Sequence, residues 1–329
     1  MGIKLIKAID RVIGTPLCLA LAPFKRNKAF STDKVLFIQL WGIGETVLTF
    51  PAIHAFKNKY PDSNITVLCT ERNKEVYYQN SDINHLEIIS LSPISILKFM
   101  IKHRFDLVID FEEYLNISSI IAFFTGKFKI GYKGRIRSKT YNKTATYNDQ
   151  QHVVETHLDL VRLLSADDKP EQLIKLKYSA EDKIAAEAVI KSIGISDKDT
   201  IIGFGAGTAE SARSRIWPYF RELAQKLPGK KLVFFGTEEE KGSINLIIKG
   251  IDNAFNLAGK LTLRQAFAAI ERCNLFISND TGTMHIAATQ GVKTIGLFGP
   301  NIPTRWAPFG KGNVSIYKGE ICKYSPCIN

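Results

Sequence analysis

The sequence KVLFIQLWGIGETVLTFPA, from Lys34 to Ala52, determines the fold class that we predict for this chain. It begins with an apolar run typical of a buried strand, passes through Gly42 and Gly44, and then becomes amphipathic up to Lys59. Glycines permit a tight turn and allow a ligand to approach the backbone closely. The first N–H groups of the helix that follows are free to bind an anion. A strand, a glycine turn and a helix in this order form the repeating unit of a parallel α/β sheet.

The same alternation recurs on both sides of a polar stretch, residues 165–171, which we interpret as a linker. Before this stretch we predict strands at 35–40, 65–69 and 107–110, and helices at 94–102, 114–125 and 152–164. After it we predict strands at 200–204, 231–235, 275–278 and 294–298, and helices at 180–193, 219–227, 238–250, 263–272 and 284–290. Residues 127–143 are rich in Lys, Arg and Gly, and we expect a basic loop there. The pattern predicts an α/β protein of two Rossmann-like domains, 31–170 and 171–329, that face each other across a cleft and bind ligands at the carboxyl ends of strands.

The composition excludes several protein classes. The chain has 329 residues, 45% of them hydrophobic, with 44 Lys and Arg against 32 Asp and Glu, so its net charge is +12. These values exclude a disordered, collagen-like or disulfide-scaffold protein. A basic chain suits nucleic acid, an anionic membrane or a phosphorylated substrate. The aromatic residues are not interleaved with Lys and Arg, so we do not expect nucleic acid as a partner.

Residues 1–30 form a basic, amphipathic N-terminal segment that contains a single acidic residue, Asp10. Its uncharged stretch from Val12 to Phe24 is shorter than the ~20 residues that a membrane-spanning helix needs. We favour a segment that lies on an anionic membrane surface. Two alternatives stay open: a signal peptide, because Ala20-Leu21-Ala22 resembles a cleavage site, and a helix packed on the protein's own surface.

Three motifs follow predicted strands, where the chemistry of such sheets is concentrated. The first is Gln39–Thr46, which contains Gly42, Gly44 and Glu45; Glu45 on its own could simply complement the dipole of the following helix. The second runs from Ile277 to His285, and a diphosphate could sit on the N–H groups of Thr281, Gly282 and Thr283. Asp280 precedes them, and His285 lies one turn into the helix, where a structural role is the alternative. The third is Phe204–Thr208, containing Gly205 and Ala206, followed by Arg215, whose guanidinium matches phosphate oxygens.

A further acidic run and the absence of several known motifs limit the reactions that this chain could catalyse. Glu238 to Glu240 follow another strand and place carboxylates where a ribose could be held. The P-loop pattern GxxxxGK[ST] does not occur, so ATP hydrolysis of that kind is not expected. The metal-binding patterns HExxH and EF-hand do not occur either, and we expect no metal cofactor. Val47 replaces the third glycine of GxGxxG, which makes a nicotinamide-dependent oxidoreductase a weak alternative; it would bind NADH in the N-terminal domain.

Together, these motifs resemble glycosyltransferase family 9, the lipopolysaccharide heptosyltransferases. The resemblance runs through residues 34–327 in the expected order. The segments that carry it are Leu36–Ala52, Gly205-Ala206, Arg215-x-Trp217-Pro218, Ser278–Ala288, Leu297–Pro300 and Cys322-x-x-Ser325-Pro326-Cys327. The most specific of them are Asp280–His285 and Gly299-Pro300.

The resemblance implies a GT-B fold and an inverting, metal-independent transfer of a heptose or related sugar from an ADP- or other nucleotide-diphosphate sugar to a lipid-linked saccharide. It assigns the acceptor to the N-terminal domain, with Gly42 and Gly44 on the acceptor side, and the donor to the C-terminal domain. The donor-binding positions that it implies are Gly205, Ala206, Glu238, Glu240, Asp280, Thr281, Gly282, Thr283 and His285.

Two positions depart from the family pattern. Glu45 stands where the family has an aspartate that acts as general base, and the extra methylene re-aims the carboxylate by about an ångström. Arg215 matches the family's lysine beside the donor phosphates and would stabilise the leaving diphosphate. These departures leave open a catalytically weak homologue that only binds a nucleotide sugar or a glycan.

The resemblance also implies partners and a location. We expect a nucleotide-diphosphate sugar as donor and a phosphorylated glycolipid as acceptor, the latter near the basic residues 127–143. The expected location is cytoplasmic, on the inner face of the bacterial inner membrane, with residues 1–30 on the anionic surface.

Overall fold

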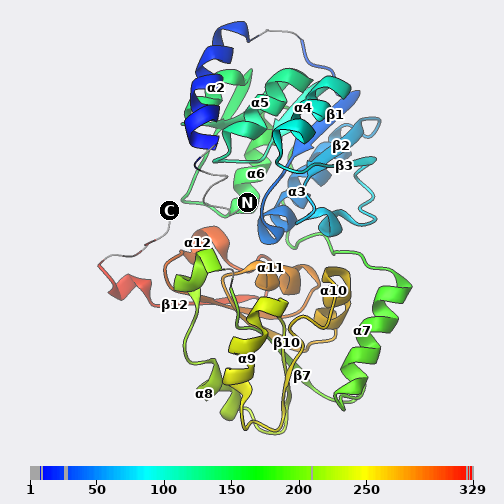
Figure 1. Ribbon diagram of the computed structural model, residues 1–329, viewed down its shortest axis with the longest axis vertical. Coiled ribbons are helices and arrows are strands. Elements are labelled where there is room, and N and C mark those ends of the chain that lie inside the picture. The colour runs from blue at the N-terminus through cyan, green and yellow to red at the C-terminus, as the bar shows by residue number, and fades with distance from the viewer. Residues whose placement is uncertain are drawn as a thin grey trace. The chain divides into compact units, whose positions relative to one another are not determined.

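The computed structural model describes residues 8, 10–25, 29–208, 210–323, 325 and 327. The chain divides into two compact units, Met1–Pro170 and Glu171–Asn329, and each is built on a parallel sheet of six strands (Figure 1). Residues 1–7, 9 and 26–28 of the N-terminal segment lie outside the description. Within the part of the chain described, no helix has both the length and the apolar character needed to cross a membrane.

The first unit, blue to green in Figure 1, alternates strands and helices after a short helical N-terminal segment. In chain order its elements are η1 (Asp10–Gly14), α2 (Thr15–Leu21), η2 (Ala22–Phe24), β1 (Lys34–Ile38), α3 (Ile43–Lys59), β2 (Asn64–Cys69), η3 (Lys74–Tyr77), β3 (His85–Ile88), α4 (Pro93–Lys102), β4 (Phe105–Asp110), α5 (Asn116–Thr125), β5 (Gly126–Lys133), η4 (Ile136–Thr140), β6 (Lys143–Thr146) and α6 (Val153–Arg162).

The second unit, green to red, repeats the pattern with shorter helices. Its elements are α7 (Ala180–Ser192), β7 (Ile201–Gly205), η5 (Glu210–Arg215), α8 (Phe220–Gln225), β8 (Lys231–Phe234), η6 (Glu238–Glu240), α9 (Lys241–Ile248), β9 (Ala254–Asn256), α10 (Leu263–Glu271), β10 (Leu275–Asn279), α11 (Gly282–Thr289), β11 (Thr294–Phe298), α12 (Pro303–Trp306), β12 (Val314–Tyr317) and η7 (Gly319–Ile321).

The two sheets share one topology. The strand order is β3-β2-β1-β4-β5-β6 in the first and β12-β11-β10-β7-β8-β9 in the second. In both sheets the first strand of the unit lies between the second and the fourth, so the direction in which the sheet grows reverses there. This is the Rossmann order, and its switch points lie between β1 and β4 and between β7 and β10. Ligands of such sheets bind outside the carboxyl ends of the strands that flank the switch point.

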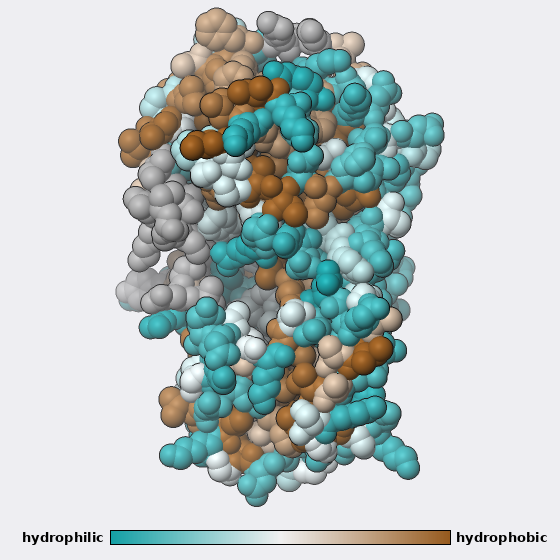
Figure 2. Space-filling view, turned by 45° about the vertical axis from the view of Figure 1, so that its right-hand side comes forward, coloured by the Kyte–Doolittle hydropathy of each residue, from teal (hydrophilic) through white to brown (hydrophobic). Residues whose placement is uncertain are grey.

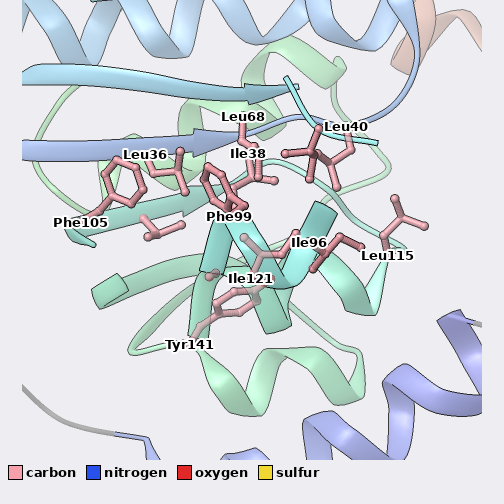
Figure 3. Packing of buried hydrophobic residues seen from close by; sticks show 13 residues of the cluster. Leu36, Ile38, Leu40, Leu68, Ile96, Phe99, Phe105, Leu115, Ile121 and Tyr141 are labelled. Carbon is pink, nitrogen blue, oxygen red and sulfur yellow. The ribbon is translucent and has the colours of Figure 1, made fainter. Parts of the chain in front are cut away.

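The apolar residues of β1 pack against helices on both faces of the first sheet. Leu36 and Ile38 point to one face, where Ile96 and Phe99 of α4 meet them (Figure 3). Phe37 points to the other face, where its ring lies 5.4 Å from the ring of Phe56 in α3. Successive side chains of a strand point to opposite faces, and a strand buried on both faces therefore reads as a continuous apolar run. That is why the sequence alone locates β1.

The described part of the N-terminal segment, from Asp10 to Phe24, is packed on its own unit, as one of the three interpretations of the sequence predicts. The Asp10 carboxylate accepts hydrogen bonds from the N–H groups of Asn116 (2.8 Å) and Ile117 (2.7 Å), which begin α5. These N–H groups have no acceptor within the helix, so the carboxylate caps it and complements its dipole. Gly14 approaches so closely that a Cβ there would lie 2.7 Å from Cβ of Asn116. Cys18 is fully buried beside Ser119.

Residues 127–143 are not the basic loop that the sequence suggests. They contain most of β5, the 3₁₀ helix η4 and the start of β6, and β5 pairs with β4 on one side and with β6 on the other. Two of the basic side chains, Lys129 and Arg137, are buried. The error has a physical cause. The apolar positions of β5 alternate with Lys and Gly, so its sequence does not resemble a buried strand. Only its pairing with β4 determines which of the basic side chains are buried.

Arg137 forms the central ion pair of the first unit. Its guanidinium bonds the carboxylate of Asp110, the last residue of β4, and both side chains are almost fully buried. Tyr141 donates its hydroxyl to the same carboxylate at 2.7 Å, and Ser118 accepts a bond from Arg137 at 2.9 Å. Burial opposes the charge on Arg137, but Asp110 and Tyr141 raise the pKa of its guanidinium above the ordinary value. The pair connects β4, α5 and η4.

We expect Arg137→Met to lower the free energy of unfolding by about 3–5 kcal/mol, because it leaves the Asp110 carboxylate buried without its counter-charge. Lys127→Met is the matched control: it breaks the more exposed pair with Asp106 and should cost less than about 1 kcal/mol. Urea denaturation of the two variants and the wild type measures the difference. Equal losses of unfolding free energy would show that the buried ion pair contributes no more to stability than the exposed one.

Candidate active site

The switch point of the second unit is lined by small side chains. A Cβ at Gly205, the last residue of β7, would lie 2.3 Å from Ser278 Oγ and 2.4 Å from Thr283 Oγ1, so the position requires glycine. Ser278 belongs to β10, and Thr283 lies in the first turn of α11. The strand end, the neighbouring strand and the helix start therefore meet closely, as the sequence motifs predict.

Hydroxyl groups gather at the start of α11. Thr281 and Thr283 have their hydroxyl oxygens 3.0 Å apart, and Ser278 Oγ lies 3.4 and 3.3 Å from them. Thr281 is the N-cap of α11, yet its side chain makes no capping bond to the helix. The first N–H groups of a helix attract anions, and the helix dipole strengthens this attraction. The arrangement can bind a diphosphate.

Arg215 is held beside this helix start by Asp280. Its Nη1 lies 3.3 Å from Asp280 Oδ2 and donates to the Asp280 carbonyl oxygen at 3.2 Å. Burial raises the pKa of the Asp280 carboxyl, although Arg215 and the Asn301 amide, which donates to it, lower it. The Asp280 carboxylate thus pairs with Arg215 and holds its guanidinium in place. Arg215 Nε is buried and has no hydrogen-bond partner among the residues described, so one guanidinium donor is not used by the protein.

Asn279 fixes the loop that carries Arg215. Its amide donates to the Ala206 carbonyl at 2.8 Å, and its Oδ1 accepts from the N–H of Trp217 at 2.9 Å. One buried side chain therefore connects the ends of β7 and β10 to the segment just after η5. His285 is also buried, within α11, and its ring lies 6.4 Å from the ring of Trp306. The packing of His285 agrees with the structural role that we gave as its alternative.

The two predicted donor glutamates have different surroundings. Glu240 lies against the end of β7: a Cβ at Gly207 would be 2.2 Å from its Oε1. Its other oxygen accepts from the Thr237 N–H at 2.7 Å in a capping box. Glu238 lies near Gly259, is largely exposed and pairs with Lys241 at 2.9 Å. Of the two carboxylates, that of Glu240 is the one beside the glycine-rich strand end.

The first unit places Glu45 at its own switch point. Gly42, the N-cap of α3, has a φ of 73°, and a Cβ there would overlap the Glu45 carboxylate, 1.5 Å from Oε2. Glycine is thus required for the backbone conformation and for the space that the carboxylate occupies. Gly44 and Glu45 lie in the first turn of α3, the element that begins at Ile43.

A buried asparagine holds the Glu45 turn in place. Asn73 donates to the carbonyl of Gln39 at 2.9 Å and to the hydroxyl of Thr46 at 2.8 Å. Thr46 in turn donates to the Gly42 carbonyl at 2.6 Å. The turn after β1 is therefore fixed by side chains from β2's exit loop and from α3 itself.

Glu112, which we did not predict as a site residue from the sequence, faces the same turn. Its Oε1 accepts from the Leu40 N–H at 2.7 Å, and the side chain is buried. Burial, together with the negative charges of Asp110 and Glu45, raises the pKa of Glu112 to about 8. A signal was present in the sequence: Asp110 ends a predicted strand, and Glu112 and Glu113 follow it at the sheet edge where the other motifs lie. The sequence around Asn73 and Arg137 contains no comparable pattern. Their structural roles depend on partners that are distant in the sequence, which only the folded chain brings together.

Comparisons with known proteins identify relatives along nearly the whole chain. The family model of glycosyltransferase family 9 (heptosyltransferase) matches residues 94–327. Lipooligosaccharide heptosyltransferase 2 of Haemophilus ducreyi is 26% identical over 87% of this chain and 92% of its own length. The fold is similar to that of a family 9 glycosyltransferase from Veillonella parvula, with a TM-score of 0.79, 22% identity and 89% of each chain covered. It is also similar to E. coli ADP-heptose lps heptosyltransferase II, with a TM-score of 0.71, 22% identity, and 89% and 95% of the two chains covered.

The raised pKa of Glu112 predicts a pH-dependent stability. The folded chain keeps a proton that the unfolded chain releases near its ordinary pKa of 4.5, so stability falls as the pH rises from there towards about 8. Glu112→Gln keeps an acceptor for Leu40 but has no proton to lose. We expect the wild type to lose about 1–3 kcal/mol more than this variant between pH 6 and pH 8.5.

Denaturant titrations at the two pH values measure this difference. Glu71→Gln, at an exposed carboxylate, should follow the wild type at both pH values. If Glu112→Gln also followed the wild type, Glu112 would not be the group that holds the proton.

Proposed function

The chain belongs to glycosyltransferase family 9, and on that basis we propose that it transfers a heptose, or a related sugar, from an ADP- or other nucleotide-diphosphate sugar to the lipopolysaccharide core or another lipid-linked glycan. It is an enzyme, a glycosyltransferase with the GT-B fold. The observation that carries the proposed donor is the switch point of the second unit, where Gly205, the threonine hydroxyls and Arg215 converge.

The second unit supplies what a nucleotide diphosphate needs. Its diphosphate would lie on the first N–H groups of α11 and accept a further bond from Arg215, while the Glu240 carboxylate would accept from a ribose hydroxyl. As the glycosidic bond breaks, negative charge grows on the departing diphosphate. Donors fixed in advance at the site of a developing charge stabilise the transition state without reorganising. Asp280 and Asn279 act as positioning residues, since they hold Arg215 and its loop.

Glu45 would act as the general base on the acceptor. Its carboxylate would take the proton of the acceptor hydroxyl while that oxygen attacks the anomeric carbon from the face opposite the leaving group, which inverts its configuration. Glu112 is mainly protonated at neutral pH because its pKa is raised to about 8. It therefore adds little repulsion to a charged Glu45. Two carboxylates in one site with different protonation states permit an acid and a base to coexist.

We also propose that no metal ion takes part, because Arg215 and the α11 N-terminus can balance the diphosphate charge. The acceptor would be a phosphorylated glycolipid. The protein would act in the cytoplasm on the inner face of the bacterial inner membrane, its N-terminal segment on the anionic surface. The exposed apolar side chains and the exposed Arg11 of that segment support this location.

A screen of nucleotide sugars tests the proposal directly. A bound donor raises the melting temperature by mass action, so ADP-heptose or a related ADP-sugar should stabilise the chain more than unrelated nucleotides do. Transfer of the sugar to a truncated lipopolysaccharide core is then assayed with EDTA present. Binding of the donor in calorimetry without any transfer would favour the second candidate, a binding homologue, which the presence of Glu45 at the family's aspartate position supports.

Glu45→Gln should lower kcat by about 10²–10⁴ and leave the affinity for ADP unchanged, because it removes only the base. Glu71→Gln removes an exposed carboxylate and should match the wild type in both measurements. Steady-state kinetics and ADP titration separate the two quantities. Full turnover by Glu45→Gln would exclude Glu45 as the base.

Glu240→Gln and Glu238→Gln should differ although they are only two residues apart. We expect the first to weaken ADP binding roughly five- to tenfold, because a charged acceptor for the ribose is lost while the bond from Thr237 is kept. The second should bind like the wild type, because Glu238 pairs with Lys241 at the surface. Equal affinities for ADP in all three proteins would remove Glu240 from the donor site.

A further inference from the structure

One face of the first sheet is covered by a row of three helices. Helix α5 packs against α2 on one side and against α4 on the other (Figure 1). The inner side chains of α4 and α5 belong to the core around β1, as Figure 3 shows for Ile96, Phe99 and Ile121. We refer to Asp10–Leu21, α4 and α5 as the outer helical layer. Its outer side carries features that packing within the unit does not use.

Helix α4 exposes an aliphatic stripe. Ile94, Leu97 and Ile101 are spaced by three and four residues, so they share one face of the helix. Their exposed fractions are 68%, 53% and 68%, whereas Ile96 and Phe99 on the opposite face are buried. The helix is thus apolar on both sides. The inner side builds the core, and the outer side leaves three large aliphatic groups in water.

The N-terminal part of the layer continues this surface. Val12, Ile13 and Leu19 are 70%, 61% and 45% exposed, while Gly14 and Cys18 face α5. Figure 2 shows that hydrophobic side chains reach the surface of the molecule in patches between the hydrophilic ones. Large apolar groups that gather at a surface usually mark an interaction site.

Apart from Asp10, every charged side chain of the outer helical layer is positive. The Asp10 carboxylate is bound to the first N–H groups of α5. The remaining charged residues are Arg11, Lys98 and Lys102, all exposed, and α5 carries none. Lysine stems can lie along an apolar surface while their ammonium groups reach anionic headgroups. A second copy of the same face would instead bring like charges together.

We propose that the outer helical layer docks on an anionic lipid bilayer, with Ile94, Leu97 and Ile101 of α4 entering the headgroup boundary and Lys98 and Lys102 contacting lipid phosphates. This assigns to α4 a docking role that we expected from the sequence only for residues 1–30. The inference deepens the proposed function, because it would bring the first unit to a membrane that holds a lipid-linked acceptor.

The full chain is tested by co-sedimentation with vesicles of phosphatidylcholine and 30% phosphatidylglycerol, so no sugar transfer is needed. We expect the triple variant Ile94→Ser, Leu97→Ser, Ile101→Ser to bind at least about tenfold more weakly than the wild type. The matched control is Ile184→Ser with Leu246→Ser, which removes equally exposed side chains, 67% and 72%, from the second unit. The control should bind like the wild type. Circular dichroism melts verify that both variants fold.

A double variant tests the role of the positive charges. Lys98→Gln with Lys102→Gln should weaken binding to the anionic vesicles roughly tenfold and should lose most of the salt dependence. On vesicles of phosphatidylcholine alone, this variant and the wild type should bind equally. Equal binding to the anionic vesicles would overturn the assignment of these lysines.

The proposal is wrong if the wild type does not bind anionic vesicles, or if the triple variant binds as tightly as the wild type. It is also wrong if the wild type sediments as a dimer that the triple variant dissociates, since the face would then belong to a second copy. Transfer to a water-soluble acceptor distinguishes the two proposals. Vesicle binding without any transfer would overturn the proposed function and leave the docking face standing.

Discussion

The order of the parallel strands is the constraint on which the other features of this protein depend. In each unit the first strand pairs with both the second and the fourth, so the chain must turn back across the sheet after the third strand. The loops after the first and fourth strands then leave the sheet in different directions, and the space between them is open to a ligand. Every residue to which we give a chemical role follows one of the strands in this inner part of a sheet or is held by a residue that does.

Both units place a carboxylate and an arginine at the end of the fourth strand, but they use the pair differently. In the first unit Asp110 and Arg137 are buried and join three elements, so the pair is structural. In the second unit the side chain of Arg215 remains 28% exposed beside the buried Asp280. Burial makes the difference: a charge pair enclosed by protein cannot contact a substrate, whereas a partly exposed guanidinium can. The same arrangement thus supports a scaffold in one unit and a binding site in the other.

All the strands that the sequence predicts are inner ones, and β5 is the inner strand that it misses. The β1, β2, β4, β7, β8, β10 and β11 segments are apolar on both faces and end in turn residues, so a local pattern identifies them. The strands that were missed are β3, β5, β6, β9 and β12; β3, β6, β9 and β12 are short, and all five contain exposed or half-exposed positions. Their pairing partners, rather than their own composition, make them strands. The same limit explains the error at residues 127–143, where β5 carries a buried lysine.

The sequence by itself determined the alternation of strands and helices, the glycines that end β1 and β7, and the motifs that connect this chain to its family, because each depends on residues close together in the chain. Only the tertiary structure decided that Glu112 stands near Glu45, that Glu240 and not Glu238 lies beside the end of β7, and that α4 is apolar on its outer side too. Proximity and burial are set by contacts between residues far apart in sequence. A raised pKa or an exposed isoleucine is therefore a property of the packed chain, which no local stretch of sequence contains.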